Sequence, residues 1–224
     1  KTYSGEYNGG KGTLRRIARE EIRLSDEDLN HIVSLYDGEI LYIDSLVSQV
    51  YASIKKTGLA DNSIVFVTGD HGEDLYQRNF YFFHAASIYD SVLHVPLIVI
   101  LPNKFMAGKR IDSIVKNIDI APTALEFANI DSPPHFQGSS LIPLIKGEEV
   151  EEDFQFAMAE KKLGKETILS IRTEKWRYVY NPKRVYPPSV KGKYYKIARE
   201  ELYDIEKDPK EVVNIVQKNK DIED

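Results

Sequence analysis

The longest regular pattern in the chain is an apolar stripe within residues 25–58. Its positions recur at steps of three and four, the spacing of one face of an α-helix: Leu29, Ile32, Tyr36, Ile40, Ile43, Val47, Val50 and Ile54. Ser25 and Asp28 precede it as S-x-x-D, a variant of the capping box. Residues 55–58 supply the two lysines and the glycine that are typical of a helix C-terminus. The sequence therefore predicts one long helix here.

Two short apolar runs predict buried strands. Residues 64–67 are apolar without a break and rich in β-branched side chains, which is typical of a strand buried on both faces of a parallel sheet. The order of helix and then strand is half of a βαβ unit. Residues 95–101 form the second run, with Pro96 near its start, where a missing N–H is tolerated.

The elements outside these runs are shorter. We expect a loop over residues 1–24, a short strand or extended segment over 111–118, and a short helix that starts near Pro122 and runs through Ala128. The polar and acidic stretch 146–153 then predicts a boundary between two parts of the chain.

Beyond that boundary the pattern changes to short strands: 154–159, 167–173 and 176–180. No helix between them is long enough for a parallel crossover, so we expect an antiparallel sheet. Residues 208–211 read Asp-Pro-Lys-Glu, which predicts a helix start. The predicted division is 1–150 for an α/β domain and 151–224 for an antiparallel subdomain.

Composition narrows the class of protein. The 224 residues are 42% hydrophobic and 29% charged, enough to fold around a core. The net charge of −5 gives no general attraction to nucleic acid. The longest apolar run is far too short to span a bilayer, and the polar start lacks the apolar centre of a signal peptide. The absence of cysteine excludes disulfides and thiolate sites.

The candidate chemistry follows the first predicted strand. Asp70 and His71 stand side by side between Gly69 and Gly72, which would permit the backbone to bend. Ligands of open α/β sheets bind beyond the carboxyl ends of strands. A carboxylate oxygen and an imidazole nitrogen together suit a divalent cation. The alternative is a polar turn that only caps the strand.

Six stretches resemble the sulfatases of the alkaline-phosphatase superfamily, in matching order: 36–44, 62–73 with TGDHGE, 89–99 with YDSVLHVPLIV, 119–123 as D-x-x-P-T, 138–144 as G-x-S-L-x-P-L, and 201–214 with ELYD and DPKE. The resemblance covers residues from about 36 to the C-terminus. It implies the C-terminal portion of an alkaline-phosphatase-like fold, with a mixed sheet flanked by helices and a small antiparallel C-terminal subdomain.

The resemblance assigns roles to three residues. Asp70 and His71 match the C-terminal pair of divalent-metal ligands, usually for Ca²⁺, or for Mn²⁺ or Zn²⁺ in phosphoesterases of the superfamily. His84 matches a lysine or histidine that contacts the sulfate or the bridging oxygen, as a catalytic and substrate-binding residue. The alternative is that His84 is only a polar residue in an aromatic loop. Glu73 would orient His71, or would be solvated.

The resemblance also implies what this chain lacks. A sulfatase carries two further aspartate ligands and a formylglycine nucleophile, made from Cys or Ser in a C/S-x-P-x-R context, in an N-terminal half. The chain has neither a cysteine nor Ser-x-Pro-x-Arg. We therefore expect a C-terminal fragment that is inactive alone. Its uncovered apolar surfaces would face solvent or allow self-association.

Three hypotheses remain open at this stage. The first is a sulfuric ester hydrolase acting on a small sulfated ester, with formylglycine supplied by the missing half. The second is a phosphoesterase, phosphonate hydrolase or phosphoglycol transferase of the same superfamily. The third is a non-catalytic assembly module. The compartment is not predicted.

Overall fold

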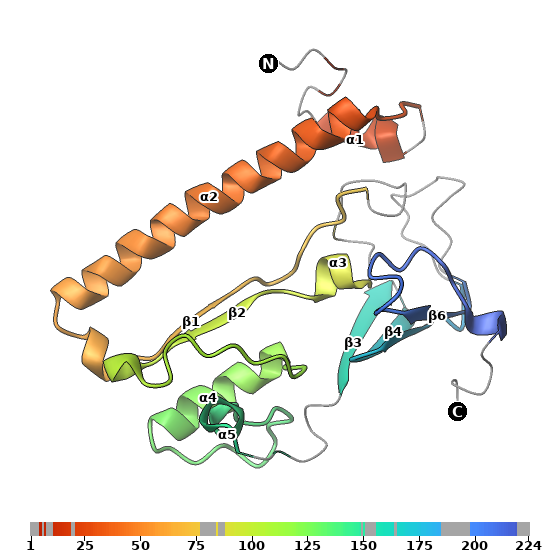
Figure 1. Ribbon diagram of the computed structural model, residues 1–224. Helices are drawn as coiled ribbons and strands as arrows, with labels where there is room; N and C mark the ends of the chain where they lie inside the picture. Colours follow the sequence, from red (N-terminus) through yellow and green to blue (C-terminus); the bar gives the residue numbers. More distant parts are fainter. Residues whose placement is uncertain are drawn as a thin grey trace.

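Figure 1 shows the arrangement of the chain in a computed structural model that describes residues 5, 7, 11–18, 21–76, 84, 88–148, 150, 156–163, 165–184 and 198–218. Its α-helices are α1 (Lys11–Ala18), α2 (Asp26–Lys56), α3 (Asp90–Leu93), α4 (Ile120–Phe127) and α5 (Ile142–Lys146). Its strands are β1 (Val65–Thr68), β2 (Leu97–Ile100), β3 (Phe156–Leu163), β4 (Glu166–Thr173), β5 (Trp176–Tyr180) and β6 (Glu200–Asp204). The strands form two sheets, β1-β2 and β3-β4-β5-β6.

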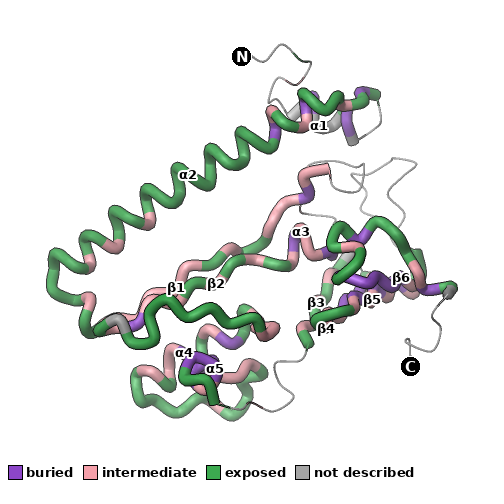
Figure 2. Tube along the Cα trace, viewed as in Figure 1, coloured by how far each residue is buried: buried purple, intermediate pink, exposed green. Residues whose placement is uncertain are grey.

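The predicted long helix is confirmed as α2, and its start is set by the capping box. The Ser25 hydroxyl accepts the Asp28 N–H at 3.2 Å, and Asp28 Oδ2 accepts the Ser25 N–H at 2.9 Å. Most of the helix is exposed along its length (Figure 2). Leu41 is 72% exposed and Val50 61%, whereas the residues that α2 buries are Asp28 and Ile32. Leu29 and Ile32 at the start of the apolar stripe pack into the core, whereas Tyr36, Ile40, Ile43 and Val50 farther along it are exposed.

Strands β1 and β2 pair antiparallel, with Val65 opposite Ile100 and Thr68 opposite Leu97. The expectation of a strand buried on both faces of a parallel sheet is therefore wrong for β1. The chain leaves β1 at one end of the pair and returns to β2 at the same end, so residues 69–96 act as a long hairpin connection. An apolar run fits either pairing, and only the route of this connection decides the direction. The candidate site lies within the connection.

The predicted C-terminal antiparallel sheet is confirmed. β3, β4, β5 and β6 lie in sequence order, each antiparallel to its neighbour. This sheet shares one hydrophobic cluster with residues of the N-terminal part, including Ile88 and Tyr89 just before α3, and Ile168, Val179 and Tyr203 of the sheet. The contact brings β3 beside the region of α3, as Figure 1 shows.

The D-x-x-P-T stretch joins α4 to the segment before α5. Asp119 is fully buried, and its carboxylate accepts the N–H groups of Lys116 at 2.8 Å and Ser139 at 3.0 Å. The Thr123 hydroxyl donates to the Asp119 carbonyl and accepts the Leu141 N–H at 2.9 Å. The predicted short helix is confirmed as α4, and these contacts fix its position.

The predicted helix start at 208–211 is wrong. Glu211 adopts a left-handed backbone with φ 53°, and the Asp208 carboxylate accepts the Val213 N–H at 2.7 Å, which closes a turn. The Glu211 side chain is 2% exposed and is paired with Arg177 of β5. This tertiary ion pair overrides the local helix-start signal, and a 3-10 turn follows only at Val216–Lys218.

Two other expectations are corrected. Within 1–24, Lys11–Ala18 form α1, which buries Thr13 and Ile17. Within 111–118 no short strand forms; Lys116 has an extended backbone, and a 3-10 turn begins at Asn117–Asp119, where the buried Asp119 carboxylate holds the backbone. In both places a buried side chain, Ile17 in α1 and Asp119 in the 3-10 turn, fixes the local backbone.

Candidate functional site

The turn after β1 is held against α3 by Gly72. The Gly72 N–H donates to the Val92 carbonyl at 2.8 Å. A Cβ on Gly72 would lie 2.2 Å from the Ser91 carbonyl oxygen, so only glycine fits. Neither Gly69 nor Gly72 adopts a left-handed backbone. Gly72 is therefore needed for a close approach to α3 and not for the bend that the sequence suggested.

Asp70 and His71 converge at the exposed tip of this turn. Asp70 Oδ2 lies 3.7 Å from His71 Nε2, and the two side chains are 90% and 41% exposed. Asp70 Oδ1 accepts the His71 N–H at 2.9 Å, which holds the carboxylate in place. His71 Nδ1 lies 2.9 Å from the Gly72 carbonyl oxygen. Because a carbonyl only accepts, Nδ1 donates its proton to the Gly72 carbonyl, which leaves Nε2 on the side of the Asp70 carboxylate.

His84 lies directly against His71. The two imidazole rings stack, with centroids 4.0 Å apart and 24° between planes. His84 Nδ1 is 3.2 Å from Glu73 Oε2. Glu73 therefore orients His84, whereas the sequence had suggested that it orients His71. The other carboxylate oxygen of Glu73 is buried without a hydrogen-bond partner among the described residues.

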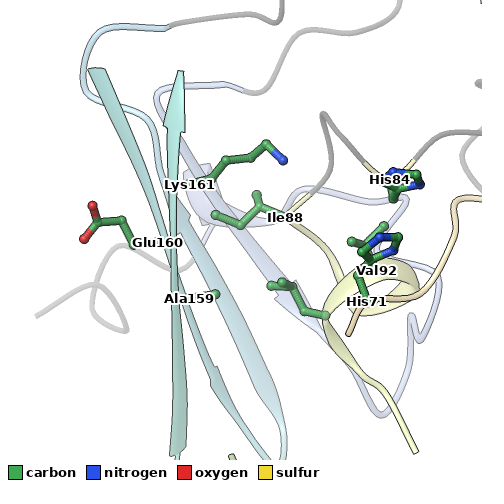
Figure 3. A pocket seen from close by; sticks show the side chains of 8 residues that line it. His71, His84, Ile88, Val92, Ala159, Glu160 and Lys161 are labelled. Carbon is green, nitrogen blue, oxygen red and sulfur yellow. The ribbon is translucent and has the colours of Figure 1, made fainter. Parts of the chain in front are cut away.

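A cavity of about 220 Å³ opens beside the two histidines. Figure 3 shows that the lining residues come from the turn, from the region of α3 and from β3. The apolar part of its lining is Ile88, Val92, Leu93 and Ala159. Lys161 extends from β3 into the same space, whereas the Glu160 side chain points away from it (Figure 3).

Lys161 lines the cavity but was not among the candidate site residues predicted from the sequence. Exposure alternates strictly along β3, with 157, 159 and 161 on the covered face and 156, 158, 160 and 162 on the exposed face. Two alanines at 157 and 159 share the covered face with this lysine. A lysine in register with small inward residues was a signal that the sequence contained.

The Asp70–His71 pair fits part of a divalent-metal site. Ligand atoms about 2.0–2.6 Å from one cation are compatible with the 3.7 Å between Asp70 Oδ2 and His71 Nε2. The Nδ1–Gly72 contact gives the ring the tautomer and orientation that a metal-bound imidazole uses. Among the described residues, no third His, Cys, Asp or Glu joins them in a metal-binding group. The two residues can supply only part of a ligand set.

Comparison with known proteins identifies the family. A family model described as Sulfatase matches residues 1–130, and one described as N-sulphoglucosamine sulphohydrolase, C-terminal, matches residues 78–223. The chain belongs to the sulfatase family. Arylsulfatase K of Bos taurus is 28% identical to this sulfatase chain over 211 residues, which are 88% of the chain and 35% of that protein.

Solved structures agree in fold. A protein solved in complex with its substrate D-glucosamine-2-N,6-O-disulfate superimposes with a TM-score of 0.67 and 25% identity, over 81% of this chain and 35% of that one. The phosphonate monoester hydrolase of Agrobacterium radiobacter superimposes with a TM-score of 0.70 and 23% identity, over 88% of this chain and 40% of the hydrolase chain. The sulfatase chain spans about a third of the length of the curated relatives.

Family membership confirms the coarse expectations. The fold is the C-terminal portion of an alkaline-phosphatase-like fold, and the family is one of sulfuric ester hydrolases that use a divalent metal and formylglycine. In the described part of the chain, no helix has the length and hydropathy to cross a bilayer. The roles of Asp70, His71 and His84 and the division at residue 150 stay predictions.

Proposed function

We propose that this chain supplies half of the metal site and part of the substrate site of an enzyme that hydrolyses small sulfated esters. The observation that carries the proposal is the convergence of Asp70 Oδ2 and His71 Nε2, 3.7 Å apart, beside a cavity lined by His84. In this proposal Asp70 and His71 are metal ligands, and Ca²⁺ is the expected ion. The remaining ligands and the formylglycine nucleophile would come from sequence outside this chain.

The chain's own residues have distinct tasks in this proposal. A bound divalent metal would offset the charge that develops on the sulfuryl oxygens. The Gly72 contact with Val92 keeps the two ligands at one edge of the cavity. Glu73 accepts from His84 Nδ1 at 3.2 Å, which orients the imidazole of His84 at the edge of the cavity. There it would contact the sulfate or give a proton to the leaving oxygen.

The test uses the full-length protein with 4-nitrophenyl sulfate and added Ca²⁺. We expect turnover by the wild type, loss of turnover in Asp70→Ala and weaker Ca²⁺ binding by calorimetry. Asp112→Ala removes an exposed carboxylate away from the cavity and serves as the matched control. Unchanged turnover in Asp70→Ala would remove Asp70 from the metal site.

A phosphoester or phosphonate hydrolase is the second candidate. It is favoured by His71, because an imidazole nitrogen suits Mn²⁺ or Zn²⁺ better than Ca²⁺, which prefers oxygen ligands. Turnover of 4-nitrophenyl phosphate with Mn²⁺ or Zn²⁺, in the absence of turnover of 4-nitrophenyl sulfate with Ca²⁺, would decide for this candidate.

The isolated 224-residue chain is proposed to be inactive, because two ligands alone hold a metal weakly. The third candidate, an assembly module, draws on the exposed apolar side chains of α2, with Leu41 72% exposed and Ile43 54%. Light scattering of the isolated chain over a range of concentrations tests self-association. Robust turnover of 4-nitrophenyl sulfate by the isolated chain would contradict the proposed inactivity.

A further inference from the structure

Lys161 of β3 is a cation on the covered face of its strand. Its neighbour Lys162 lies on the exposed face and pairs with Glu160, with Nζ 3.6 Å from Oε1. Lys161 makes no ion pair and no hydrogen bond with the described residues. Figure 3 shows its side chain extending over Ile88 into the cavity, toward the side where His84 and His71 stand. Two adjacent lysines thus differ completely in their surroundings.

Partial burial without a counter-charge is costly for an ammonium group. Desolvation lowers the pKa of Lys161 below its usual value, and no nearby carboxylate acts to restore it. A group of this kind is stabilised when an anion enters beside it. The other polar side chains of the cavity, His71 and His84, enter from the opposite wall (Figure 3).

The cavity between these walls is apolar. Ile88, Val92 and Leu93 line it on the side of α3, and Ala159 lines it on β3. A ligand that fills it would present one anionic group to the histidines and an apolar surface, such as a sugar ring face, to this lining. A second anionic group at the far end would meet Lys161.

We propose that Lys161 binds a second anionic substituent of the substrate, distinct from the sulfate held near His71 and His84. The C-terminal sheet would then select doubly charged sulfated esters over singly charged ones. This assignment rests on the proposed function for the site itself, but it can be measured as binding without turnover.

The experiment compares two ligands with the same sugar ring. D-glucosamine-2-N,6-O-disulfate carries two anionic groups, and N-acetyl-D-glucosamine 6-sulfate carries one. Their dissociation constants are measured by calorimetry on the full-length protein in EDTA, which prevents metal-dependent turnover. The proteins are the wild type, Lys161→Gln, Lys161→Met and the matched control Lys162→Gln. Lys161→Met keeps the length of the apolar stem if Lys161→Gln does not fold.

We expect the wild type and Lys162→Gln to bind the disulfate at least tenfold more tightly than the monosulfate, because the second anionic group gains a charge-assisted hydrogen bond to Lys161. Lys161→Gln and Lys161→Met should lose this preference while binding the monosulfate as the wild type does. An unchanged preference in both Lys161 variants overturns the proposal. The proposal is also overturned if the Lys161 variants lose the same affinity for both ligands, or if Lys162→Gln loses the preference for the disulfate as they do. It is overturned as well if the wild type does not bind the disulfate.

Turnover of 4-nitrophenyl sulfate by the wild type separates the two proposals. Absence of turnover with a Lys161-dependent preference for the disulfate would remove the proposed function and keep the second anion site. Turnover of 4-nitrophenyl sulfate without a Lys161-dependent preference for the disulfate would keep the proposed function and remove the second anion site.

Discussion

Arg177 and Glu211 form a buried ion pair, with Nε 2.8 Å from Oε1 and side chains only 3% and 2% exposed. Glu211 Oε2 also accepts the Asp90 N–H at 2.7 Å, and the Asp90 carboxylate pairs with both Arg177 and Arg172. The cluster therefore attaches the C-terminal turn and β5 to the first residue of α3. Since α3 accepts the Gly72 N–H, this cluster supports the position of the candidate metal turn.

Glu211→Ala should reduce stability strongly. The substitution leaves the Arg177 guanidinium buried without one of its carboxylates, and breaking a buried pair by removing one partner costs about 3–5 kcal/mol. Urea unfolding followed by circular dichroism measures the change. Glu206→Ala, at an exposed acid five residues earlier, is the control and should stay within about 0.5 kcal/mol of the wild type. Equal effects of the two variants would show that the ion pair contributes nothing specific.

Gly72→Ala should damage the site while Gly69→Ala is tolerated. A methyl group on Gly72 meets the Ser91 carbonyl at 2.2 Å, whereas one on Gly69 has its nearest neighbour, the His71 carbonyl oxygen, at 3.5 Å. The turn must then move away from α3 and displace both candidate ligands. We expect Gly72→Ala to weaken Ca²⁺ binding at least tenfold in the full-length protein, and Gly69→Ala to change it less than threefold. Calorimetric titration with Ca²⁺ measures both, and similar affinities for the two variants would contradict the packing argument.

Asp119→Ala should destabilise the fold, although Asp119 does not line the cavity of the candidate site. The variant leaves the N–H groups of Lys116 and Ser139 without their acceptor. Each unsatisfied buried donor costs about 1–3 kcal/mol, so a loss of about 2 kcal/mol or more is expected in urea unfolding. Asp131→Ala removes an exposed carboxylate and is the control. A loss below about 0.5 kcal/mol would mean that water replaces the carboxylate at no cost.

Glu73→Ala should act on turnover through His84. The carboxylate holds the His84 ring by Nδ1, and the ion pairs of the described residues do not join it to Asp70 or His71. We expect kcat with 4-nitrophenyl sulfate to fall about 10–100-fold, as for loss of a partner that orients a site residue, while the affinity for Ca²⁺ stays within about twofold. Glu73→Gln, which can still accept a hydrogen bond, should recover part of kcat. A parallel loss of Ca²⁺ affinity would place Glu73 with the metal ligands instead.

The elements that depend on neighbours in sequence were predictable. The S-x-x-D box fixes the start of α2 because its partners are three residues apart. The short alternating strands after residue 153 predicted antiparallel pairing, because their connections leave no room for a crossover helix. Asp70 and His71 could be chosen as the candidate ligands because they end an apolar run in a motif that resembles a known family.

Other features exist only because distant residues meet. The antiparallel pairing of β1 with β2 depends on the return path of residues 69–96, and an apolar run has the same composition for either direction. The predicted helix does not start at Asp208, because Glu211 instead forms a buried ion pair with Arg177. Arg177 lies 34 positions before Glu211 in the chain. Glu73 and His84 pair across eleven residues.

The sequence by itself determined the family, the long helix and the C-terminal sheet, and it selected Asp70 and His71 as the predicted ligand pair, because these features depend on local spacing and on motifs. Only the tertiary structure decided that Lys161 shares a cavity with the two histidines, and that the apolar stripe of α2 is largely exposed beyond Ile32. Burial of a charge or exposure of an apolar stripe depends on which surfaces the folded chain brings together, and local spacing does not encode that.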